Sequence, residues 1–377
     1  MEKIRILHVV SNMQQGGIEN FIMNIYRNID RNLIQFDFMV HYKSKFYFDD
    51  EIEQLGGEIY RLSFMEDKNI FKYLKELDSF FKENSSKYDI VHAHMGSLGG
   101  VYLYYAKKYN IPIRIAHSHG ASHLNTLKGY SKFLLNKGFK QNANNLWACS
   151  TEAGIYMFGK YRKFEFIPNT VDYNKFYYNL KARKEIRKKY NIDDSTFLIG
   201  NVGRFNLQKN HIFLIKIMKE LRKIDNENKY KMILVGTGEL EDKIKNEIKK
   251  NNLEDIVILP GVRNDVNNFY CAFDMLVMPS LFEGLPLTGV EAQISGLRCI
   301  FSDSITREVT ISNNAFFISL KKDEKEWAKE IVSKKDYVRE EFFKVSNTFD
   351  LKKCTKEIEN KYVELYKGVK NEKRRNI

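Results

Sequence analysis

Short apolar runs alternate with amphipathic segments along the first half of the chain. Runs expected to be strands cover residues 4–10, 36–40, 59–62, 90–93, 113–116 and 146–148. Helical periodicity covers residues 18–27, 70–83 and 101–108 between them. Strands and helices that alternate at this spacing predict a parallel sheet covered by helices on both faces.

The pattern restarts after Asp172. A charged helix expected at 180–190 precedes a second opening strand at 197–202, a glycine-containing loop and a helix at 212–224. Further strands are expected at 232–235, 257–259, 275–278, 299–301 and 316–318. Because 377 residues exceed what one hydrophobic core usually holds, the restart predicts an α/β fold with two Rossmann-like domains, 1–170 and 171–350. The Pro and Asn of Ile167-Pro-Asn-Thr-Val-Asp172 suit a linker between them.

Composition places only weak limits on the partners and the cellular compartment of the protein. The net charge of +13, from 61 basic and 48 acidic residues, favours partners that carry phosphate, although a generally lysine-rich composition explains it equally well. The four cysteines form no CxxC pair, which argues against a zinc or redox centre and for a reducing compartment. No run approaches the ~20 apolar residues of a membrane span, so a cytoplasmic protein is expected.

Residues 278–296 combine a strand end, a turn and a helix start. Glu283 is expected in the turn, Pro286 as the first helical residue, and Glu291 on the helix. The backbone N–H groups of Gly284, Leu285 and the first turn at Leu287 can bind an anion such as phosphate. Carboxylates beside a phosphate are better suited to accepting hydrogen bonds from hydroxyls. The alternative is two solvated glutamates on an ordinary βα unit.

Other candidate loops also follow predicted strands. In open parallel sheets ligands bind beyond the carboxyl ends of the strands, which is where Gly16-Gly17, His117–Gly120, Gly203–His211 and Gly236–Glu239 should lie. His117 and His119 should point the same way if the strand continues. No Cys or carboxylate stands nearby in sequence to complete a metal site with them, and Glu19 is expected to act as a helix cap.

The stretch from Phe282 to Glu291, with its two glutamates separated by seven residues, resembles the motif of retaining nucleotide-sugar glycosyltransferases of family 4, which have the GT-B architecture. The resemblance extends in the family's order through Gly16-Gly-Ile-Glu19, Ala116-His-Ser-His-Gly120, Ile167–Asp172, Gly203–His211 and Leu234–Glu239. It implies two Rossmann-like domains with parallel sheets facing a central cleft. The first would bind the acceptor and the second the sugar nucleotide, with a last helix at about 351–377 crossing back to the first domain.

The resemblance also implies roles for individual residues. Arg204 and Lys209 would clamp the diphosphate in place of a metal, since the chain has no Asp-x-Asp pair. Neither a metal nor a cofactor other than the nucleotide-sugar co-substrate is therefore expected. His119 and Glu283 would lie near the transferred sugar and Glu291 on the ribose. The remaining donor-binding positions would be Gly16, Gly17, Gly236, Gly238, Arg263, Gly284, Leu285 and Leu287.

These expectations define a retaining enzyme that moves a hexosyl unit from a UDP- or GDP-sugar to a saccharide or lipid-linked acceptor in bacterial capsule, exopolysaccharide or lipopolysaccharide assembly. A nucleotide-sugar 2-epimerase and a catalytically silent sugar-nucleotide sensor are the alternatives, and nucleic acid is not expected as a partner. A lipid-linked acceptor would place the protein at the inner face of the membrane. The basic segment Lys128–Lys137 could then lie on an anionic surface, unless Phe133 and Leu134 pack it onto the domain.

Overall fold

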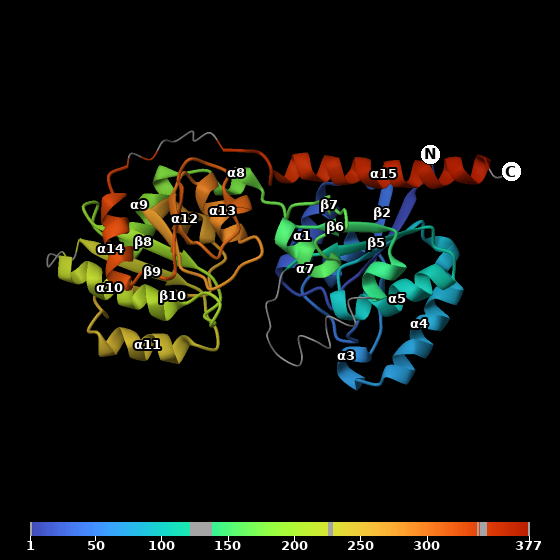
Figure 1. Cartoon of the computed structure of the whole chain (residues 1–377), viewed down its shortest axis with the longest axis horizontal. Helices are drawn as coiled ribbons and strands as arrows, with labels where there is room; N and C mark the ends of the chain where they lie inside the picture. The colour runs from blue at the N-terminus through green and yellow to red at the C-terminus, as the bar shows by residue number, and fades with distance from the viewer. Residues whose placement is uncertain (1, 121–137, 225–228, 338, 340–344, 376–377) are drawn as a thin grey trace. The chain divides into compact units, whose positions relative to one another are not determined.

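The computed structural model describes residues 2–120, 138–224, 229–337, 339 and 345–375. The chain divides into two compact units, Met1–Thr170 together with Leu351–Ile377, and Val171–Asp350 (Figure 1). The division falls where the sequence pattern restarts. Each unit is an α/β layer structure around one parallel sheet, which confirms the predicted fold class.

The first unit contains a seven-stranded sheet in the order β3-β2-β1-β4-β5-β6-β7, in which neighbouring strands pair in parallel. Its strands are β1 (Ile4–Val9), β2 (Ile34–Val40), β3 (Ile59–Arg61), β4 (Ile90–Ala93), β5 (Ile113–Ser118), β6 (Asn145–Ala148) and β7 (Glu165–Phe166). Its described helices are α1 (Gly17–Asn28), α2 (Asp49–Gln54), α3 (Phe64–Asp67), α4 (Ile70–Asn84), the 3-10 turn η1 (Ser85–Lys87), α5 (Gly96–Lys108), α7 (Thr151–Phe158) and α15 (Leu351–Arg375).

Strand alternation divides the core of the first unit between the two faces of the sheet. Ile4 and Ile6 of β1 pack with residues of α1 and α15, whereas Leu7 and Val9 pack with residues of α4 and α5. The last helix therefore completes the core of the unit in which the chain begins, as Figure 1 also shows for α15 beside the β2 and β5 strands. The side chain of Tyr362, on α15, is 1% exposed.

The second unit contains a six-stranded parallel sheet in the order β10-β9-β8-β11-β12-β13. Its strands are β8 (Phe197–Val202), β9 (Tyr230–Val235), β10 (Val257–Gly261), β11 (Met275–Met278), β12 (Arg298–Ser302) and β13 (Ala315–Ile318). Its helices are α8 (Tyr173–Phe176), α9 (Leu180–Lys189), α10 (His211–Ile224), α11 (Glu241–Lys250), α12 (Val266–Ala272), α13 (Leu287–Ile294) and α14 (Glu324–Ser333), with the 3-10 turn η2 (Arg307–Val309).

Both sheets reverse their strand order at one point. The reversal falls between β1 and β4 in the first unit and between β8 and β11 in the second. Loops that leave such neighbouring strands run in opposite directions, which opens a crevice at the carboxyl ends of the strands. The candidate loops after β1, β8 and β11 are therefore at the positions where α/β sheets bind ligands.

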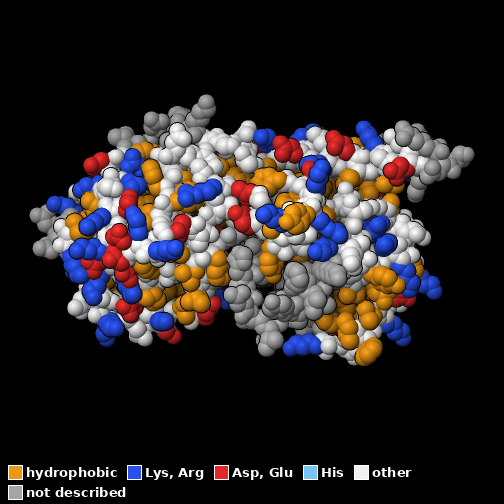
Figure 2. Space-filling view, viewed as in Figure 1, with side chains coloured by type: hydrophobic (Ala, Val, Ile, Leu, Met, Phe, Trp, Pro, Cys, Tyr) orange, Lys and Arg blue, Asp and Glu red, His pale blue; other side chains and the backbone are white. Residues whose placement is uncertain are grey.

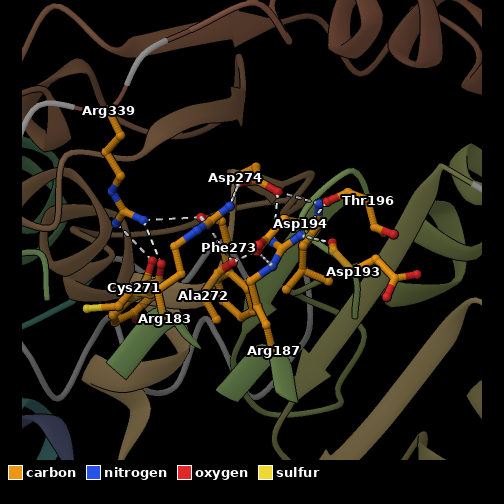
Figure 3. A network of polar contacts seen from close by, with 12 residues as sticks. Arg183, Arg187, Asp193, Asp194, Thr196, Cys271, Ala272, Phe273, Asp274 and Arg339 are labelled. Carbon is orange, nitrogen blue, oxygen red and sulfur yellow. Dashed lines mark hydrogen bonds and ion pairs between the residues drawn. The ribbon is translucent and has the colours of Figure 1, made fainter. Parts of the chain in front are cut away.

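At the amino ends of the central strands β8 and β11, arginines join α9 to the turn between α12 and β11 (Figure 3). Asp274 accepts from Arg183 at 2.7 Å and from Arg187 at 3.2 Å, and it also accepts from the backbone N–H of Leu198 at 2.7 Å. Arg339 donates to the backbone carbonyls of Tyr270, Cys271, Phe273 and Ser295. The arginines thus satisfy carbonyls at the C-terminus of α12, where cations are favoured.

Asp274 is the carboxylate closest to Arg187, a side chain that is only 2% exposed. Replacing Asp274 with Ala should lower the free energy of unfolding by about 3–5 kcal/mol, because it leaves a buried guanidinium uncompensated. Urea denaturation measures this change. The matched control is Asp255→Ala, which breaks the more exposed Arg222–Asp255 pair and should cost about 1 kcal/mol or less. Equal losses in the two variants would contradict the prediction.

Candidate functional site

The first candidate loop, after β1, leads into the N-terminus of α1. A Cβ atom added at Gly16 would lie 2.3 Å from Oε2 of Glu19, so the glutamate side chain folds back over the start of its own helix. No side-chain hydrogen bond caps this helix start, so the capping role expected for Glu19 stays a prediction. A Cβ at Gly17 would meet nothing within 4 Å. A side chain at position 16 would therefore displace only the tip of the flexible Glu19 side chain, and open space lies beside position 17.

Five histidines gather on the face of the first sheet that α1 and α15 cover. Parallel pairing brings β1 beside β4 and β4 beside β5, with His8 opposite His92 and Ala93 opposite Ala116. Because side chains of alternate residues on a strand share a face, five histidines on or just beyond β1, β4 and β5 lie on the same face of the sheet. The cluster consists of His8, His92, His94, His117 and His119, and Phe21 of α1 packs on the last two.

Hydrogen bonds connect these rings in two chains. In the first, His8 Nδ1 lies 3.0 Å from His94 Nε2, and His94 Nδ1 lies 2.7 Å from His119 Nε2. In the second, the Tyr362 hydroxyl lies 2.7 Å from His92 Nδ1, and His92 Nε2 lies 3.1 Å from His117 Nδ1. His119 is the most exposed of the five and is half-buried. It is therefore the member that a ligand could reach.

Burial keeps the cluster neutral. It lowers the pKa of His8 to about 3 and that of His119 to about 4, and it also lowers the pKa values of His92, His94 and His117. Among the described residues, His8, His92 and His94 form one group whose ring nitrogens are close enough to share a metal ion, and His94, His117 and His119 form a second. The sequence prediction considered only the pair at 117 and 119 as metal ligands, because the other three come from distant strands.

In the second unit, the loops after the neighbouring strands β8 and β11 bring Lys209 and Glu283 together. Lys209 Nζ lies 2.6 Å from Glu283 Oε1, with side-chain exposures of 14% and 8%. Gln208 donates through Nε2 to Glu283 Oε2 at 3.0 Å and to the carbonyl of Phe282 at 3.0 Å. The carboxylate is thereby held from two sides. Lys209 is itself positioned by its backbone N–H, which donates to Asn206 Oδ1 at 3.1 Å.

Glu291 lies on α13 and accepts a hydrogen bond of 2.7 Å from the Tyr270 hydroxyl. Burial raises the pKa of Glu291, whereas Tyr270 and the charges of Lys175 and Lys209 act in the opposite direction. Lys209 is thus close enough to influence both predicted glutamates. Lys209, Glu283 and Glu291 are the predicted donor-site residues that the fold brings together within one unit.

Arg204 and Arg263, both predicted to bind the nucleotide sugar, each pair with a carboxylate. Arg204 Nε lies 3.1 Å from Glu239 Oε2, and both side chains are exposed, at 72% and 55%. Arg263 makes two hydrogen bonds to Asp265, of 2.9 and 3.0 Å. Among the described residues, neither arginine forms a hydrogen bond or ion pair with Lys209 or Glu283. A ligand that used either guanidinium would have to compete with its acidic neighbour.

The glycines of the loop after β9 have a structural explanation. Gly236 has φ 144° and its missing Cβ would lie 2.1 Å from the carbonyl oxygen of Gly203, while a Cβ at Gly238 would lie 2.5 Å from that of Phe205. The backbones of these two loops are in close contact, and Phe205 N donates to Thr237 O at 2.8 Å. Glycine at 236 and 238 is therefore required for loop packing even without a ligand.

The helix start after Glu283 differs slightly from expectation. Pro286 is the N-cap, not the first helical residue, and α13 begins at Leu287. No side chain caps this terminus. Leu285 is 8% exposed and packs in the core, and Leu287 packs partly against it. Their side chains fix the turn, so that only backbone groups of Gly284, Leu285 and Leu287 remain for an anion.

Sequence reasoning missed Gln208, Tyr270 and the histidines at 8, 92 and 94. Gln208 lies within the motif Gly203–His211, and its place in that motif could have identified it. Tyr270 lies 21 residues before its partner Glu291. The histidines occur in three separate strands, and only the strand order and register bring them together.

Two family models match the chain. The model described as Glycosyltransferase Family 4 matches residues 15–175, and the model described as Glycosyl transferases group 1 matches residues 182–334. One match therefore falls almost wholly within the first unit and the other within the second.

Three relatives align over most of their length. EpsF of Bacillus subtilis (strain 168), which is named as a glycosyltransferase, is 34% identical over 312 residues, covering 81% of this chain and 80% of the relative. The UDP-Gal:alpha-D-GlcNAc-diphosphoundecaprenol alpha-1,3-galactosyltransferase of Escherichia coli is 26% identical over 84% of each chain. The capsular polysaccharide biosynthesis glycosyltransferase CapH of Staphylococcus aureus is 26% identical over 96% of this chain and 99% of its own.

Solved structures share the fold. A glycosyltransferase from Rickettsia africae ESF-5 superposes with a TM-score of 0.75 at 18% identity, covering 97% of this chain and 99% of its own. Anabaena Alr3699/HepE, in complex with UDP and glucose, gives a TM-score of 0.70 at 18% identity and 98% coverage of both chains. Similarity at this level of identity concerns the architecture, and it agrees with the two parallel sheets described above.

The neutral histidines make stability depend on pH. In the unfolded chain these histidines gain a proton near pH 6.5, whereas in the folded first unit their lowered pKa values keep them neutral. Their contribution is therefore fully present above pH 6.5 and is lost as the pH falls below it. Each of these rings should cost about 1.4 kcal/mol for each pH unit below 6.5, and so should His41, outside the cluster but in the same unit, where burial lowers the pKa to about 4.

The two tryptophans separate the units in this measurement, because Trp147 belongs to the first and Trp327 to the second. In the Trp327→Phe variant the remaining Trp147 reports on urea unfolding of the first unit. In the Trp147→Phe variant the remaining Trp327 reports on the second. Between pH 7.5 and 5.5 the first unit should lose several kcal/mol more than the second, in which His211 is the one described histidine with a lowered pKa. Equal losses would show that the cluster is not buried and neutral.

Proposed function

Because the chain belongs to the family 4 glycosyltransferases with the GT-B fold, we propose that it transfers a hexosyl unit from a nucleotide sugar with retention of the anomeric configuration. The family and its named relatives identify a glycosyltransferase of polysaccharide biosynthesis. The observation that carries the finer proposal is the Lys209–Glu283 pair, with Glu291 close by, at the strand-order reversal of the second sheet.

Departure of the nucleotide makes negative charge grow on its diphosphate. A cation already fixed in position stabilises that charge without reorganising during the reaction. Lys209 meets this requirement, since Glu283 and the backbone contact with Asn206 hold it. Arg204 would join it by leaving Glu239, which costs little because an exposed ion pair contributes only about 0–1 kcal/mol. The two cations would take the place of a metal ion.

The remaining groups suit the sugar and the nucleoside. Tyr270 donates to one oxygen of Glu291, which leaves the other oxygen free to accept from ribose hydroxyls. Glu283 keeps Lys209 in place and can accept from a hydroxyl of the transferred hexose. His119 is proposed as a further ligand of that hexose. We propose no covalent attack by Glu283, because its two oxygens are engaged with Lys209 and Gln208.

The donor is proposed to be a UDP- or GDP-hexose. The name of the Escherichia coli relative, with UDP-Gal as donor and a diphosphoundecaprenol-linked acceptor, supports UDP and a lipid-linked saccharide. The complex of HepE with UDP and glucose supports the same nucleotide in a protein of this fold. The proposal extends these partners to this chain.

Replacing Lys209 or Arg204 with Ala should each lower turnover about 10²-fold, the usual effect of removing one transition-state charge stabiliser. Release of UDP from UDP-hexoses, in the presence of an acceptor and EDTA, measures the turnover. Arg222→Ala is the control, because Arg222 belongs to a partly exposed ion pair with Asp255 on the surface of the same unit.

Normal turnover in both clamp variants would contradict the diphosphate clamp. Complete loss of wild-type activity in EDTA would contradict independence from metal. Product analysis tests the activity itself, because a 2-epimerase would alter the donor without any acceptor and a sensor would produce nothing. The anomeric configuration of the product, read by NMR, tests retention.

A lipid-linked acceptor leads to a proposed contact with the membrane surface. Within the described residues no helix is long and apolar enough to cross a bilayer. The basic segment Lys128–Lys137 lies outside the described residues. At the start of α4, however, Ile70 and Phe71 are 41% and 82% exposed, and the exposed Lys72 and Lys75 follow. Figure 2 shows hydrophobic side chains gathered on this face of the first unit.

Phe71→Ser should weaken binding to phosphatidylglycerol vesicles severalfold, because an exposed aromatic ring and nearby lysines together suit an anionic interface. Co-sedimentation at low salt measures the effect. Tyr161→Ser is the matched control, since Tyr161 is 95% exposed in the same unit. If neither the wild type nor the control sediments with vesicles, the peripheral contact is wrong and a soluble acceptor is favoured.

A further inference from the structure

Gln208 binds the turn that carries Glu283 through both its backbone and its side chain. Its carbonyl oxygen accepts from the backbone N–H of Leu281 at 2.8 Å. Its side-chain Nε2 donates to the carbonyl of Phe282 and to Glu283 Oε2, each at 3.0 Å. The loop after β8 and the turn after β11 are therefore joined directly before Lys209.

Other side chains hold the backbone at the start of this turn. Asn210 donates from Nδ2 to the carbonyl of Pro279 at 3.2 Å, and its φ of 56° is in the left-handed region, which Asn enters more readily than most residues. The hydroxyls of Ser302 and Ser304 both donate to the carbonyl of Ser280 at 2.6 Å. The backbone path is therefore fixed independently of the carboxylate that the turn carries.

The partners of Gln208 identify which end of its amide faces them. A backbone carbonyl and an ionised carboxylate can only accept hydrogen bonds. Nε2 carries two N–H groups and can donate one to each partner, whereas the amide oxygen would repel both. Both side-chain donors of Gln208 are thus engaged within the protein. Its effect on a ligand has to pass through Glu283.

Glu283 receives two different kinds of contact. Its Oε2 accepts the amide N–H of Gln208 with good hydrogen-bond geometry. Its Oε1 lies 2.6 Å from Lys209 Nζ, but this buried oxygen is approached outside the angles of a hydrogen bond. Attraction between opposite charges depends on distance, whereas a hydrogen bond also depends on direction. The amide, and not the ammonium, therefore fixes how the carboxylate is turned.

We propose that Gln208 is a positioning residue of the donor site, whose amide fixes the direction of the Glu283 carboxylate and so leaves Lys209 available to a diphosphate. The carboxylate then stays in place when its ion pair with Lys209 is broken. The identification of the ligands as a hexose and a diphosphate rests on the proposed transferase function. The pairing of amide and carboxylate does not.

A role in packing alone is the competing explanation for Gln208. Gln208→Glu separates the two explanations, because it keeps the size of the side chain and the backbone hydrogen bond to Leu281. An ionised glutamate has no N–H for the two acceptors, and two carboxylates this close do not both ionise readily. In the variant, the new carboxyl group and Glu283 should therefore share one proton.

The first test measures this shared proton without any substrate. In the unfolded variant the new carboxyl group loses its proton near pH 4.3, whereas the folded variant keeps it at higher pH. The variant should therefore lose stability as the pH rises. With Trp147→Phe as the parent, so that Trp327 reports on the second unit, its unfolding equilibrium constant should rise relative to the parent by up to about tenfold for each pH unit between 5.5 and 7.5.

Asn313→Asp is the matched control, because it adds a carboxylate at an exposed position of the same unit. Its difference from the parent should not depend on pH over this range. The charged and titratable groups around the pair are Lys209 and, interacting with Lys209, Glu291 from α13 and His211 from α10. Both substitutions leave these groups unchanged. A pH-independent difference for Gln208→Glu would overturn the proposal.

The second test separates positioning from a change in the loop itself. Gln208→Leu removes both donors but keeps a side chain of similar size, and it should lower kcat/KM for a UDP-hexose about tenfold, the loss of about one hydrogen bond to a charged group. Its affinity for UDP alone, measured by calorimetry, should stay within about twofold of wild type, because Lys209 remains. An equal fall in UDP affinity and in kcat/KM would overturn the positioning role.

The pH profile of turnover provides the third test. Gln208→Glu should be most active near pH 5.5, where the shared proton replaces one amide N–H in the bond to Glu283, and should lose kcat/KM relative to wild type as the pH rises. A profile parallel to that of wild type would contradict the proposal. If the stability results are as expected but the wild type neither binds UDP nor transfers a sugar, the proposed function fails and the pairing of amide and carboxylate stands.

Discussion

Buried polar side chains need hydrogen-bond or ion-pair partners in this fold, because parallel sheets are covered on both faces. In the second unit the candidate residues Lys209 and Glu283 lie in the loops after β8 and β11, where the sheet reverses its strand order. Lys209 is fixed by Glu283, Glu283 also by Gln208, and His119 by His94. The architecture of the candidate site follows from this requirement.

The two units meet the requirement with different chemistry. The second unit uses ion pairs, and its lysine stays charged, which suits a nucleotide diphosphate. The first unit uses imidazoles that burial keeps neutral, so it offers hydrogen bonds without adding charge. Neutral donors and acceptors suit the hydroxyls of a saccharide.

Close packing of the loops limits how far these residues can move. The backbones of the loops after β8 and β9 touch at Gly236 and Gly238, where no side chain would fit. Leu285 anchors the turn before α13 in the core. Lys209, Glu283 and Glu291 are therefore presented by rigid segments, as preorganised catalysis requires. Arg204, on an exposed part of the loop after β8, pairs instead with the exposed Glu239.

The sequence by itself determined the alternation of strands and helices, the two-domain α/β fold and the family, because hydrophobic periodicity and short motifs are local properties. Strands such as Phe197–Val202 and Met275–Met278 were predicted with the bounds that the structure gives them. Only the tertiary structure decided which polar groups meet. Strand order joins His8, His92 and His119 across 111 positions of sequence, and it pairs Tyr270 with Glu291 and Gln208 with Glu283. These contacts depend on sheet register and loop packing, which no local pattern specifies.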